Sequence, residues 1–262
     1  MAKSGQARVL SPEQQAELFE VIQEHRHPEK NTAIMQISFK LGLRAQEIAL
    51  LQLKEICRLG PIRKTIPRTF ELLEIMTLPA AYTKGADALG RSKSKYRRKS
   101  LTFTVDDFHR TVQQIETLAI SGAEVDPVSF YPTVRRHKGK SRDLPMVDED
   151  LRSALDEYLE VRLSKDCGAK PSDPLFLSQK GGPYSPNTLQ EHMAHMLRDW
   201  LGVEKATSHS GRRSLITNVI HHQGKSVKVA QKIAGHVNPS TTLIYEEPPE
   251  EEVSDALANL KS

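Results

Sequence analysis

The chain has 262 residues, of which 38% are hydrophobic and only 5% aromatic, so its core must rest mainly on Leu, Ile, Val and Ala. This length suits one large domain or two small ones. No apolar run approaches the roughly 18 residues that cross a bilayer, and the first residues lack the apolar core of a secretory signal. Cys57 and Cys167 are too few for a disulfide framework or a metal quartet. We therefore expect a cytoplasmic protein with reduced thiols and no membrane association.

The net charge of +4 is distributed unevenly. Acidic residues gather after residue 245, whereas two dense basic runs lie earlier, RSKSKYRRKS at 91–100 and RRHKGKSR at 135–142. Such runs suit a nucleic-acid backbone, because each neutralised phosphate releases counterions; a solvated basic loop is the alternative. The candidate nucleic-acid contacts are Arg91, Lys93, Lys95, Arg97, Arg98, Lys99, Arg135, Arg136 and Lys140.

The first half of the chain predicts three helices and then an irregular stretch. Ser11-Pro12-Glu13 has the cap, the proline and the acid of a helix start. The three helices are expected over about 12–25, over about 31–42 and from about residue 45. Prolines, glycines and the first basic run interrupt the chain after the third helix, so we interpret 60–128 as an insertion with a basic loop. Within it we expect one short element over 70–78 and a helix over 105–119.

The second half predicts a β-hairpin followed by helices. The hairpin has strands over 129–134 and 142–146, joined by the turn HKGK. Asp148 should cap a long helix to about Leu163, because apolar residues recur there near helical spacing. Further helices are expected over about 185–202, 210–222, 226–233, 239–245 and 250–260. The sum is a mainly α fold with a small antiparallel β-sheet.

Four short stretches carry residue types that suit chemistry on phosphate: GLRAQEIALL at 42–51, RRHKGKSRDLPM at 135–146, HSGRR at 209–213 and AGHVNPSTTLIY at 234–245. Each alone has an ordinary interpretation. Arg44 could form a surface ion pair, His209 could cap a helix with Arg212, and Tyr245 could close a helix end as an amphipathic side chain.

Together these residues form a set suited to phosphoryl transfer. Arg44 and Arg212 offer planar guanidinium groups for the oxygens of a phosphodiester. His209 and His236 can donate to those oxygens or move protons. Tyr245 is the candidate nucleophile, which such cationic surroundings would activate. The strategy is stabilisation of a pentacoordinate phosphate by cations, so no metal and no other cofactor is expected.

In this order the stretches resemble the catalytic boxes of the tyrosine recombinase, or phage integrase, family. GLRAQEIALLQL is similar to the first arginine box, RDLPMVDEDLRSALDEYL to the hairpin and its following helix, and DPLFLSQKGGPYSPNTLQ to the segment before the second box. HSGRR stands where the family has His-x-x-Arg, and GHVNPSTTLIY matches its Gly-His box, with nine positions from His236 to Tyr245. The resemblance covers about residues 11–260, apart from 60–128.

The resemblance implies a role for each matching residue. Arg44 and Arg212 would clamp the scissile phosphate, His209 would support acid–base chemistry, and His236 would hydrogen-bond the phosphate. Tyr245 would form a 3′-phosphotyrosyl link and release a 5′-hydroxyl. The implied function is site-specific DNA recombination (integration, excision or inversion) for a mobile genetic element. The implied partners are double-stranded DNA at the bacterial nucleoid, other protomers in a homotetramer, and accessory DNA-bending proteins.

The lysine of this family is harder to place. Counted back from Arg142, its usual position falls on His137, and a turn shorter by one residue would place Lys138 there. Lys138 is therefore the candidate that protonates the departing 5′-hydroxyl. Lys140 and Lys84, the latter in LPAAYTKGA, are the alternatives.

Other departures concern the domain organisation. We interpret 1–262 as a single catalytic domain without the N-terminal core-binding domain of the family, a layout that resembles the fimbrial phase-switch invertases. Gly211 and Arg213 stand where the family commonly has a large apolar residue and a histidine. The tail at 246–262 predicts a helix that docks either on a neighbouring protomer or on its own domain. Two other functions remain open, a type IB topoisomerase and a DNA-binding protein that has kept the fold without chemistry.

Overall fold

The computed structural model describes residues 7–62, 68–82, 105–122, 141–236, 238–245 and 258. Its first three helices lie close to their predicted positions: α1 (Pro12–Gln23), α2 (Pro28–Leu41) and α3 (Ala45–Leu50). Ser11 and Gln14 form a capping box at the start of α1. The second helix begins earlier than predicted, because Pro28 occupies its first turn. It ends at Gly42, whose φ of 63° suits a glycine at a helix C-terminus.

Two antiparallel strand pairs lie beside these helices. β1 (Cys57–Leu59) pairs with β2 (Phe70–Leu72), and β3 (Ile75–Leu78) pairs with β4 (Arg142–Pro145). Met76 and Leu78 are buried while Ile75 is exposed, the alternation of a half-buried strand. The apolar element expected over 70–78 is thus two strands, separated by a short turn.

The predicted hairpin is corrected in one respect. Its return strand is present as β4, but β4 pairs with β3, in the register Leu78↔Arg142. The expected first strand, 129–134, and the turn HKGK lie outside the described residues. Because β3 and β4 are far apart in sequence, the hairpin signal around HKGK could not identify this partner. Residues 79–141 instead connect two adjacent strand ends.

The second half of the chain is helical, as predicted. Asp148 caps α5 by accepting from the Leu151 amide. The helices are α5 (Glu149–Lys165), α6 (Pro186–His195) with a π-turn over Met196–Trp200, α7 (Ser210–Thr217) with a π-turn over Asn218–His222, α8 (Val227–Ala234) and α9 (Ser240–Leu243). The helix expected over 250–260 lies outside the described residues, except for residue 258.

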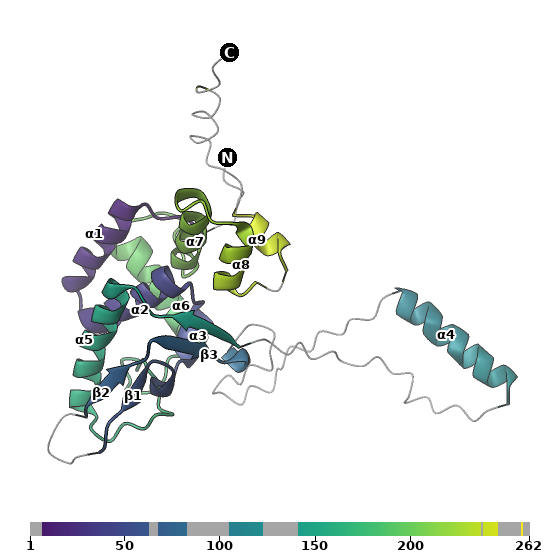
Figure 1. The fold of residues 1–262 in the computed structure, drawn as a ribbon, viewed down its shortest axis with the longest axis horizontal. Coiled ribbons are helices and arrows are strands. Elements are labelled where there is room, and N and C mark those ends of the chain that lie inside the picture. The colour runs from purple at the N-terminus through teal and green to yellow at the C-terminus, as the bar shows by residue number, and fades with distance from the viewer. Residues whose placement is uncertain are drawn as a thin grey trace.

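Helix α2 forms the centre of the fold. Nearly all its residues are buried, and it packs against α1, α3, α5 and α7 (Figure 1). One large apolar cluster surrounds it. A smaller cluster joins α7 and its π-turn to α8, and Tyr245 packs against its edge. The described residues therefore form a mainly helical fold with a small amount of antiparallel sheet, which confirms the predicted class.

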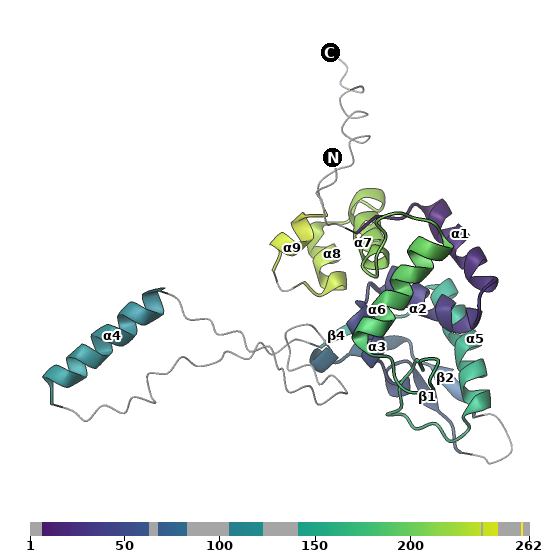
Figure 2. The ribbon, with the colours of Figure 1, turned by 180° about the vertical axis from the view of Figure 1, so that it is seen from behind.

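One helix stands apart from the others. α4 (Val105–Ile120) lies well away from every other labelled helix and strand in both views (Figures 1 and 2). The prediction of a helix over 105–119 is confirmed to within one residue. Among the described helices, including this one, none is long and apolar enough to cross a membrane.

Candidate active site

Arg44 lies at the junction between α2 and α3. It is the residue that precedes α3, with extended backbone angles. Its backbone N–H donates to Oε2 of Glu47 at 2.8 Å, and its Nη1 donates to Oε1 of the same carboxylate at 3.2 Å. The side chain of Arg44 remains 25% exposed. Glu47 thus holds the arginine at the surface while leaving part of its guanidinium group accessible.

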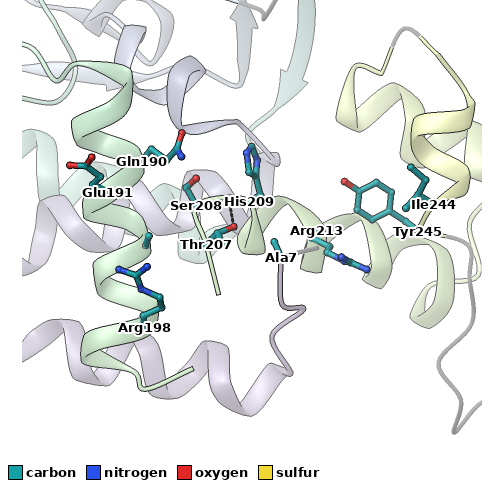
Figure 3. Close-up of a pocket in the computed structure, with 11 residues that line it drawn as sticks. Ala7, Gln190, Glu191, Arg198, Thr207, Ser208, His209, Arg213, Ile244 and Tyr245 are labelled. Carbon is teal, nitrogen blue, oxygen red and sulfur yellow. Dashed lines mark hydrogen bonds between the residues drawn. The ribbon is translucent and has the colours of Figure 1, made fainter. Parts of the chain in front are cut away.

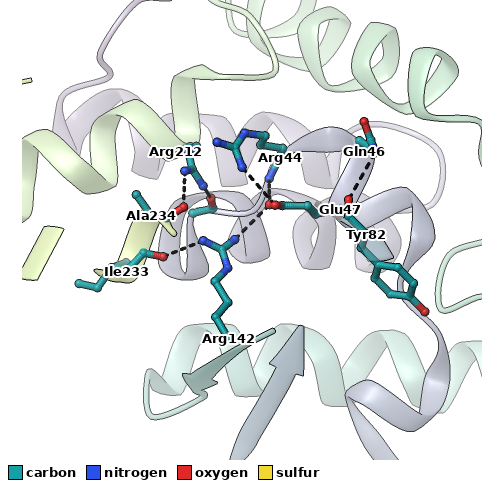
Figure 4. Close-up of polar contacts among 9 residues, drawn as sticks. Arg44, Gln46, Glu47, Tyr82, Arg142, Arg212, Ile233 and Ala234 are labelled. Atoms are coloured by element: carbon teal, nitrogen blue, oxygen red, sulfur yellow. Dashed lines mark hydrogen bonds and ion pairs between the residues drawn. The ribbon is translucent and has the colours of Figure 1, made fainter. Parts of the chain in front are cut away.

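Glu47 also binds a second arginine from a distant strand. Its side chain is only 1% exposed, and its Oε2 accepts from Nη2 of Arg142 at 3.1 Å. Nη1 of Arg142 donates to the Ile233 carbonyl near the end of α8, at 2.9 Å. Figure 4 shows Arg44, Arg142 and Arg212 converging on this region from three separate elements. Strand β4 is therefore tied to both α3 and α8.

Arg212 is buried in the first turn of α7. Its guanidinium group donates to the carbonyl of Gly42, from Nη1, and to that of Ala234, from Nη2 (Figure 4). Both acceptors are helix C-terminal carbonyls, whose partial negative charge suits a cation. Burial, and then the nearby charge of Arg44, lower the pKa of Arg212 to about 9. The group still carries its charge at neutral pH.

Gly211 brings α7 close to α2. A Cβ at this position would lie 2.4 Å from Oγ and 3.0 Å from Cβ of Ser38. A larger side chain would therefore push α7 and Arg212 away from α2. The glycine noted as a departure from the family pattern is thus required by this helix contact.

His236 follows the left-handed Gly235 that ends α8. The ring is nearly buried, and its Nδ1 lies 2.9 Å from Oγ1 of Thr242 in α9. Burial, followed by the charges of Arg212, Arg44 and Arg142, lowers the pKa of His236 to about 3. The imidazole is therefore neutral at physiological pH, and one ring nitrogen is fixed by the threonine hydroxyl.

Tyr245 lies beside this histidine, just after α9. Its ring is stacked on that of His236, with centroids 6.1 Å apart and an interplanar angle of 19°. The guanidinium carbon of Arg213 lies 5.8 Å from its ring centroid. Its backbone carbonyl lies 2.9 Å from Nε2 of His221. These contacts hold Tyr245 beside the histidines and arginines of the site.

A cavity of about 600 Å³ opens in front of Tyr245. It is lined by His209, Arg213 and Tyr245, with Arg198 and Gln190 of the α6 region on its other side (Figure 3). The Tyr245 hydroxyl points across this cavity toward the side where exposed His209 lies. An anionic backbone in this space would meet the Tyr245 hydroxyl, the His209 imidazole and the guanidinium groups of Arg198 and Arg213 together.

Two of the arginines keep unused donors. The Nε atoms of Arg142 and Arg213 are buried and have no hydrogen-bond partner among the described residues. Buried donors normally find an acceptor, so a bound group could supply the acceptor that these two N–H groups lack. Within the same part of the chain, no group of His, Cys, Asp or Glu side chains could hold a metal ion.

The structure brings together five of the predicted catalytic residues. Arg44, Arg212 and His236 interact electrostatically, Arg212 also interacts with Tyr245, and His209 shares a cavity with Tyr245. The remaining predicted site residues lie outside the described residues. They are the candidate lysines Lys138, Lys140 and Lys84, and the candidate nucleic-acid contacts Arg91, Lys93, Lys95, Arg97, Arg98, Lys99, Arg135 and Arg136.

Three residues that shape the site were missed in the sequence. Glu47 follows Arg44 by three positions, the spacing of an ion pair within a helical turn, so that signal was present. Arg142 was used in the sequence only as the reference for the position of the lysine. Thr242 was not identified, although it follows His236 by only six positions. The hydrogen bonds of Arg142 to α3 and α8 depend on tertiary packing, which leaves no local signal.

Comparisons with known proteins identify relatives of this chain. The model of the phage integrase family matches residues 115–252. The chain is 38% identical over 109 residues to the tyrosine recombinase XerC of Methylobacterium sp. (strain 4-46), over 40% of this chain and 32% of that protein. It is 34% identical over 127 residues to the tyrosine recombinase XerD of Corynebacterium glutamicum, over 47% of this chain and 41% of that protein. The matched region thus spans less than half of these relatives.

Solved structures share the fold. The whole of this chain aligns with 66% of the chain in the crystal structure of XerA recombinase, with a TM-score of 0.59 and 17% identity. The whole of this chain also aligns with 69% of the Tn1549 transposon integrase chain, solved in complex with transposon right end DNA, with a TM-score of 0.57 and 17% identity. Since the family model matches more than half of the sequence, the chain belongs to the phage integrase family.

Proposed function

We propose that this chain catalyses site-specific DNA recombination by cleaving and rejoining strands through a 3′-phosphotyrosyl intermediate on Tyr245. The observation that carries the proposal is the placement of Tyr245 against His236, within the electrostatic reach of Arg212 and at a cavity shared with His209. Membership of the family, whose relatives include proteins named tyrosine recombinases, supports it.

In the proposed cleavage step, the Tyr245 oxygen attacks the scissile phosphorus and the bond from phosphorus to the 5′-oxygen breaks. The phenol loses its proton, and the departing 5′-oxygen gains one. In the joining step a 5′-hydroxyl of a partner strand attacks the phosphotyrosine and releases the tyrosine. The phosphodiester energy is kept throughout, so the reaction requires no external energy source.

The arginines would stabilise the charge that develops on the non-bridging oxygens. Arg44 is partly exposed beside Glu47, and Arg212 is fixed by two carbonyls, so both are oriented before the DNA binds. Burial, ahead of the charges of its neighbours, holds the pKa of both Arg212 and Arg142 below the ordinary value. The negative charge of a bound phosphate would offset the repulsion among these arginines, and that supports a phosphodiester as the ligand.

The histidines would have different tasks. If the Thr242 hydroxyl donates to Nδ1 of His236, Nε2 retains its proton and can donate to a phosphate oxygen. His209 is exposed at the cavity that Tyr245 faces, so it is the candidate to exchange protons with the phenol. Thr242 is then a positioning residue that acts through His236.

We further propose Lys138 as the acid that protonates the 5′-oxygen. Lys138 precedes Arg142 by four residues, so the chain keeps its Cα within about 15 Å of the Arg142 Cα. Arg142 in turn contacts Glu47 in the site. Lys140 is nearer still along the chain, and Lys84 follows Leu78, which pairs with Arg142. All three lysines therefore remain candidates that an experiment must separate.

Double-stranded DNA is the proposed substrate, and a tetramer on DNA the proposed assembly. The complex of the Tn1549 integrase with DNA supports the first. We also retain 1–262 as one catalytic unit, 60–128 as an insertion whose basic residues contact DNA, and 246–262 as a segment that docks on a neighbouring protomer. Accessory DNA-bending proteins are candidate partners in the same assembly.

A suicide-substrate experiment tests the chemistry. Nicked duplexes made from the DNA flanking the gene are incubated with the chain, denatured, and searched for a protein–DNA adduct by gel shift and mass spectrometry. We expect an adduct on Tyr245 that Tyr245→Phe lacks. Tyr184→Phe is the matched control, because Tyr184 contacts His192 and Lys30 away from the site and should leave the adduct intact.

The outcomes separate the rival functions. Relaxation of any supercoiled plasmid, without exchange between paired sites, would replace recombination by a type IB topoisomerase activity. Tight binding without any adduct would favour a DNA-binding protein that has lost its chemistry. An adduct on a residue other than Tyr245 would contradict the proposed mechanism.

A further inference from the structure

A second cavity, of about 290 Å³, lies on a different face of α6 from the one that Tyr245 faces. Gln190 and Arg198 of the α6 region line the first cavity (Figure 3), and the two cavities share no lining residue. The walls of the second come from the turn between α1 and α2, the start of α2, and the α6 region. We call it the basic pocket, formed chiefly by His25, Arg26, Lys30, Asn31, His192 and Trp200.

Lys30 is a buried cation in this pocket, with only 9% of its surface exposed. Its Nζ donates to the Leu177 carbonyl at 3.2 Å and lies 5.6 Å from the ring centroid of Tyr184. No carboxylate of the described residues forms an ion pair with it. Burial, and then the charge of Lys165, lower the pKa of Lys30. An ammonium group has three N–H donors, so Lys30 can donate to a bound anion as well as to the carbonyl.

Other positive groups surround the same space. Arg26 lines it beside the start of α2, where no side chain caps the helix, so the partial positive charge of the first turn adds to that of the guanidinium group. Nδ1 of His192 lies 3.1 Å from the Tyr184 hydroxyl. If that hydroxyl donates, Nε2 of His192 keeps its proton as a further donor. No acidic side chain of the described residues lines the pocket, and Asp199, beside it, is bound to His195.

Asn31 adds an acceptor to this set of donors. Its side chain is buried, and Nδ2 donates to the Arg26 carbonyl at 3.0 Å. Because that carbonyl needs a donor, the amide orientation is fixed. Oδ1 is left buried with no hydrogen-bond partner among the described residues. A buried acceptor normally has a partner, so a matching ligand is an anion that also carries a hydrogen-bond donor.

This combination separates one class of oxyanion from the others. Inorganic phosphate at neutral pH is negatively charged and still carries a proton. A phosphomonoester, whose second pKa is about 6, carries one in part of its population. Sulfate and the phosphodiesters of DNA have no proton to donate, so each would leave Oδ1 of Asn31 without a partner.

We propose that the basic pocket binds a phosphate group that carries a proton, as inorganic phosphate or as a phosphomonoester. Lys30, Arg26 and His192 donate to its charged oxygens, and its P–OH group donates to Oδ1 of Asn31. The site is separate from the cavity of Tyr245 and does not take the DNA backbone.

Trp200 provides a local reporter of binding, because it is the single tryptophan of the chain and lines the pocket. The His25 ring is stacked on it, with centroids 3.8 Å apart and an interplanar angle of 8°. An anion beside this stack should favour protonation of His25 and so change the Trp200 fluorescence. Anions bound only in the cavity of Tyr245 would not contact Trp200.

Titration of the full chain with inorganic phosphate at pH 7 and constant ionic strength, without DNA, tests the proposal. The Trp200 fluorescence should change saturably, with a dissociation constant below about 1 mM. Lys30→Met keeps most of the buried length and should raise that constant at least about tenfold, as for the loss of a hydrogen bond to a charged group. Lys225→Met removes the same charge from an exposed position outside the pocket. It is the matched control and should stay within about twofold.

Anion selectivity tests the role of Asn31 without any substitution. Sulfate and dimethyl phosphate should bind at least about tenfold more weakly than inorganic phosphate, because neither carries a proton. Ribose 5-phosphate at pH 6 distinguishes the sources: tighter binding than inorganic phosphate would identify a phosphomonoester, and weaker binding would identify the free ion.

Three results would overturn the proposal. They are no saturable fluorescence change up to about 10 mM phosphate, equal affinity for sulfate, and an unchanged constant in Lys30→Met. If Lys30→Met fails to fold, the exposed Arg26→Gln decides in its place, and it should weaken binding at least about threefold.

Discussion

Arg142 donates from Nη2 to Oε2 of Glu47 at 3.1 Å, across 95 positions of sequence. The same carboxylate binds Arg44, so one buried acid orients two cations of the site. This arrangement explains how several arginines can lie together before any phosphate binds. It also makes Glu47 the residue whose loss should affect both folding and chemistry.

We expect Glu47→Ala to lower the free energy of unfolding by about 3 kcal/mol, because it leaves Arg142 buried without its carboxylate. Urea denaturation at pH 7 measures the change. Glu71→Gln is the control, since the Arg58–Glu71 pair is 3.9 Å apart and more than three-quarters exposed; it should cost less than about 0.5 kcal/mol. Equal costs for the two variants would show that Glu47 is not a structural centre of the site.

The hydrogen bond between His236 and Thr242 should matter for DNA cleavage more than for stability. Thr242→Val keeps the shape of the side chain but removes the hydroxyl that fixes Nδ1 of the imidazole. We expect the rate of adduct formation on a suicide substrate to fall about tenfold, as for the loss of about 1.4 kcal/mol of positioning. Thr242→Ser should restore most of the rate. A serine variant as slow as the valine variant would argue against a role for this hydroxyl.

The low pKa of His236 predicts a pH dependence of stability. The unfolded chain takes up a proton on this histidine below its ordinary pKa of 6.5, whereas the folded chain does so only near 3. The stabilising contribution is therefore complete above pH 6.5 and is lost as the pH falls toward 3, at up to about 1.4 kcal/mol per pH unit.

Denaturation curves at pH 7, 6 and 5 measure this effect. The glutamine of the His236→Gln variant cannot titrate. The loss of unfolding free energy between pH 6 and 5 should therefore be smaller than in the wild type, by close to the about 1.4 kcal/mol that the uptake of one proton contributes. His192, whose pKa burial lowers to about 4, should keep its own contribution in that variant. An identical pH slope in wild type and His236→Gln would contradict the burial of a neutral imidazole.

Sequence patterns predicted most helices because each has a local signal. Ser11 and Asp148 cap their helices, and the Gly42 and Gly235 boundaries have left-handed backbone angles. The strand pairing was less accessible. β4 was predicted, but its partner β3 lies more than sixty residues earlier, and a hairpin signal reaches only nearby residues.

The candidate site divides in the same way. The residue types in the four stretches, and their resemblance to the recombinase boxes, identified Arg44, Arg212, His236 and Tyr245, and the structure places them in one neighbourhood. The hydrogen bonds of Arg142 to Glu47 and Ile233 arise only when β4, α3 and α8 pack together. Contacts that depend on three separate elements have no periodicity along the chain.

The contact of Gly211 with Ser38 predicts a steric coupling between α7 and α2. Gly211→Ala should lower the free energy of unfolding by about 2 kcal/mol, because its Cβ would lie 2.4 Å from the Ser38 hydroxyl oxygen. Adding Ser38→Gly should recover part of that loss, once the cost of Ser38→Gly measured alone has been subtracted. A double-mutant cycle from urea denaturation measures the coupling, and strictly additive effects would rule out the close contact.

The lysine assignment can be tested through its leaving group. A substrate with sulfur in place of the scissile 5′-oxygen releases a thiolate, which needs no general acid. Lys138→Ala should therefore cleave ordinary DNA at least about a hundredfold more slowly than wild type, yet cleave the sulfur substrate at a rate close to the wild-type rate. Lys140→Ala and Lys84→Ala serve as matched variants, and they should be slowed equally on both substrates or not at all. Rescue by sulfur of Lys84→Ala or Lys140→Ala alone would move the acid to that residue. Rescue of none would assign the lysines to phosphate binding, because a lost phosphate contact slows both substrates to the same extent.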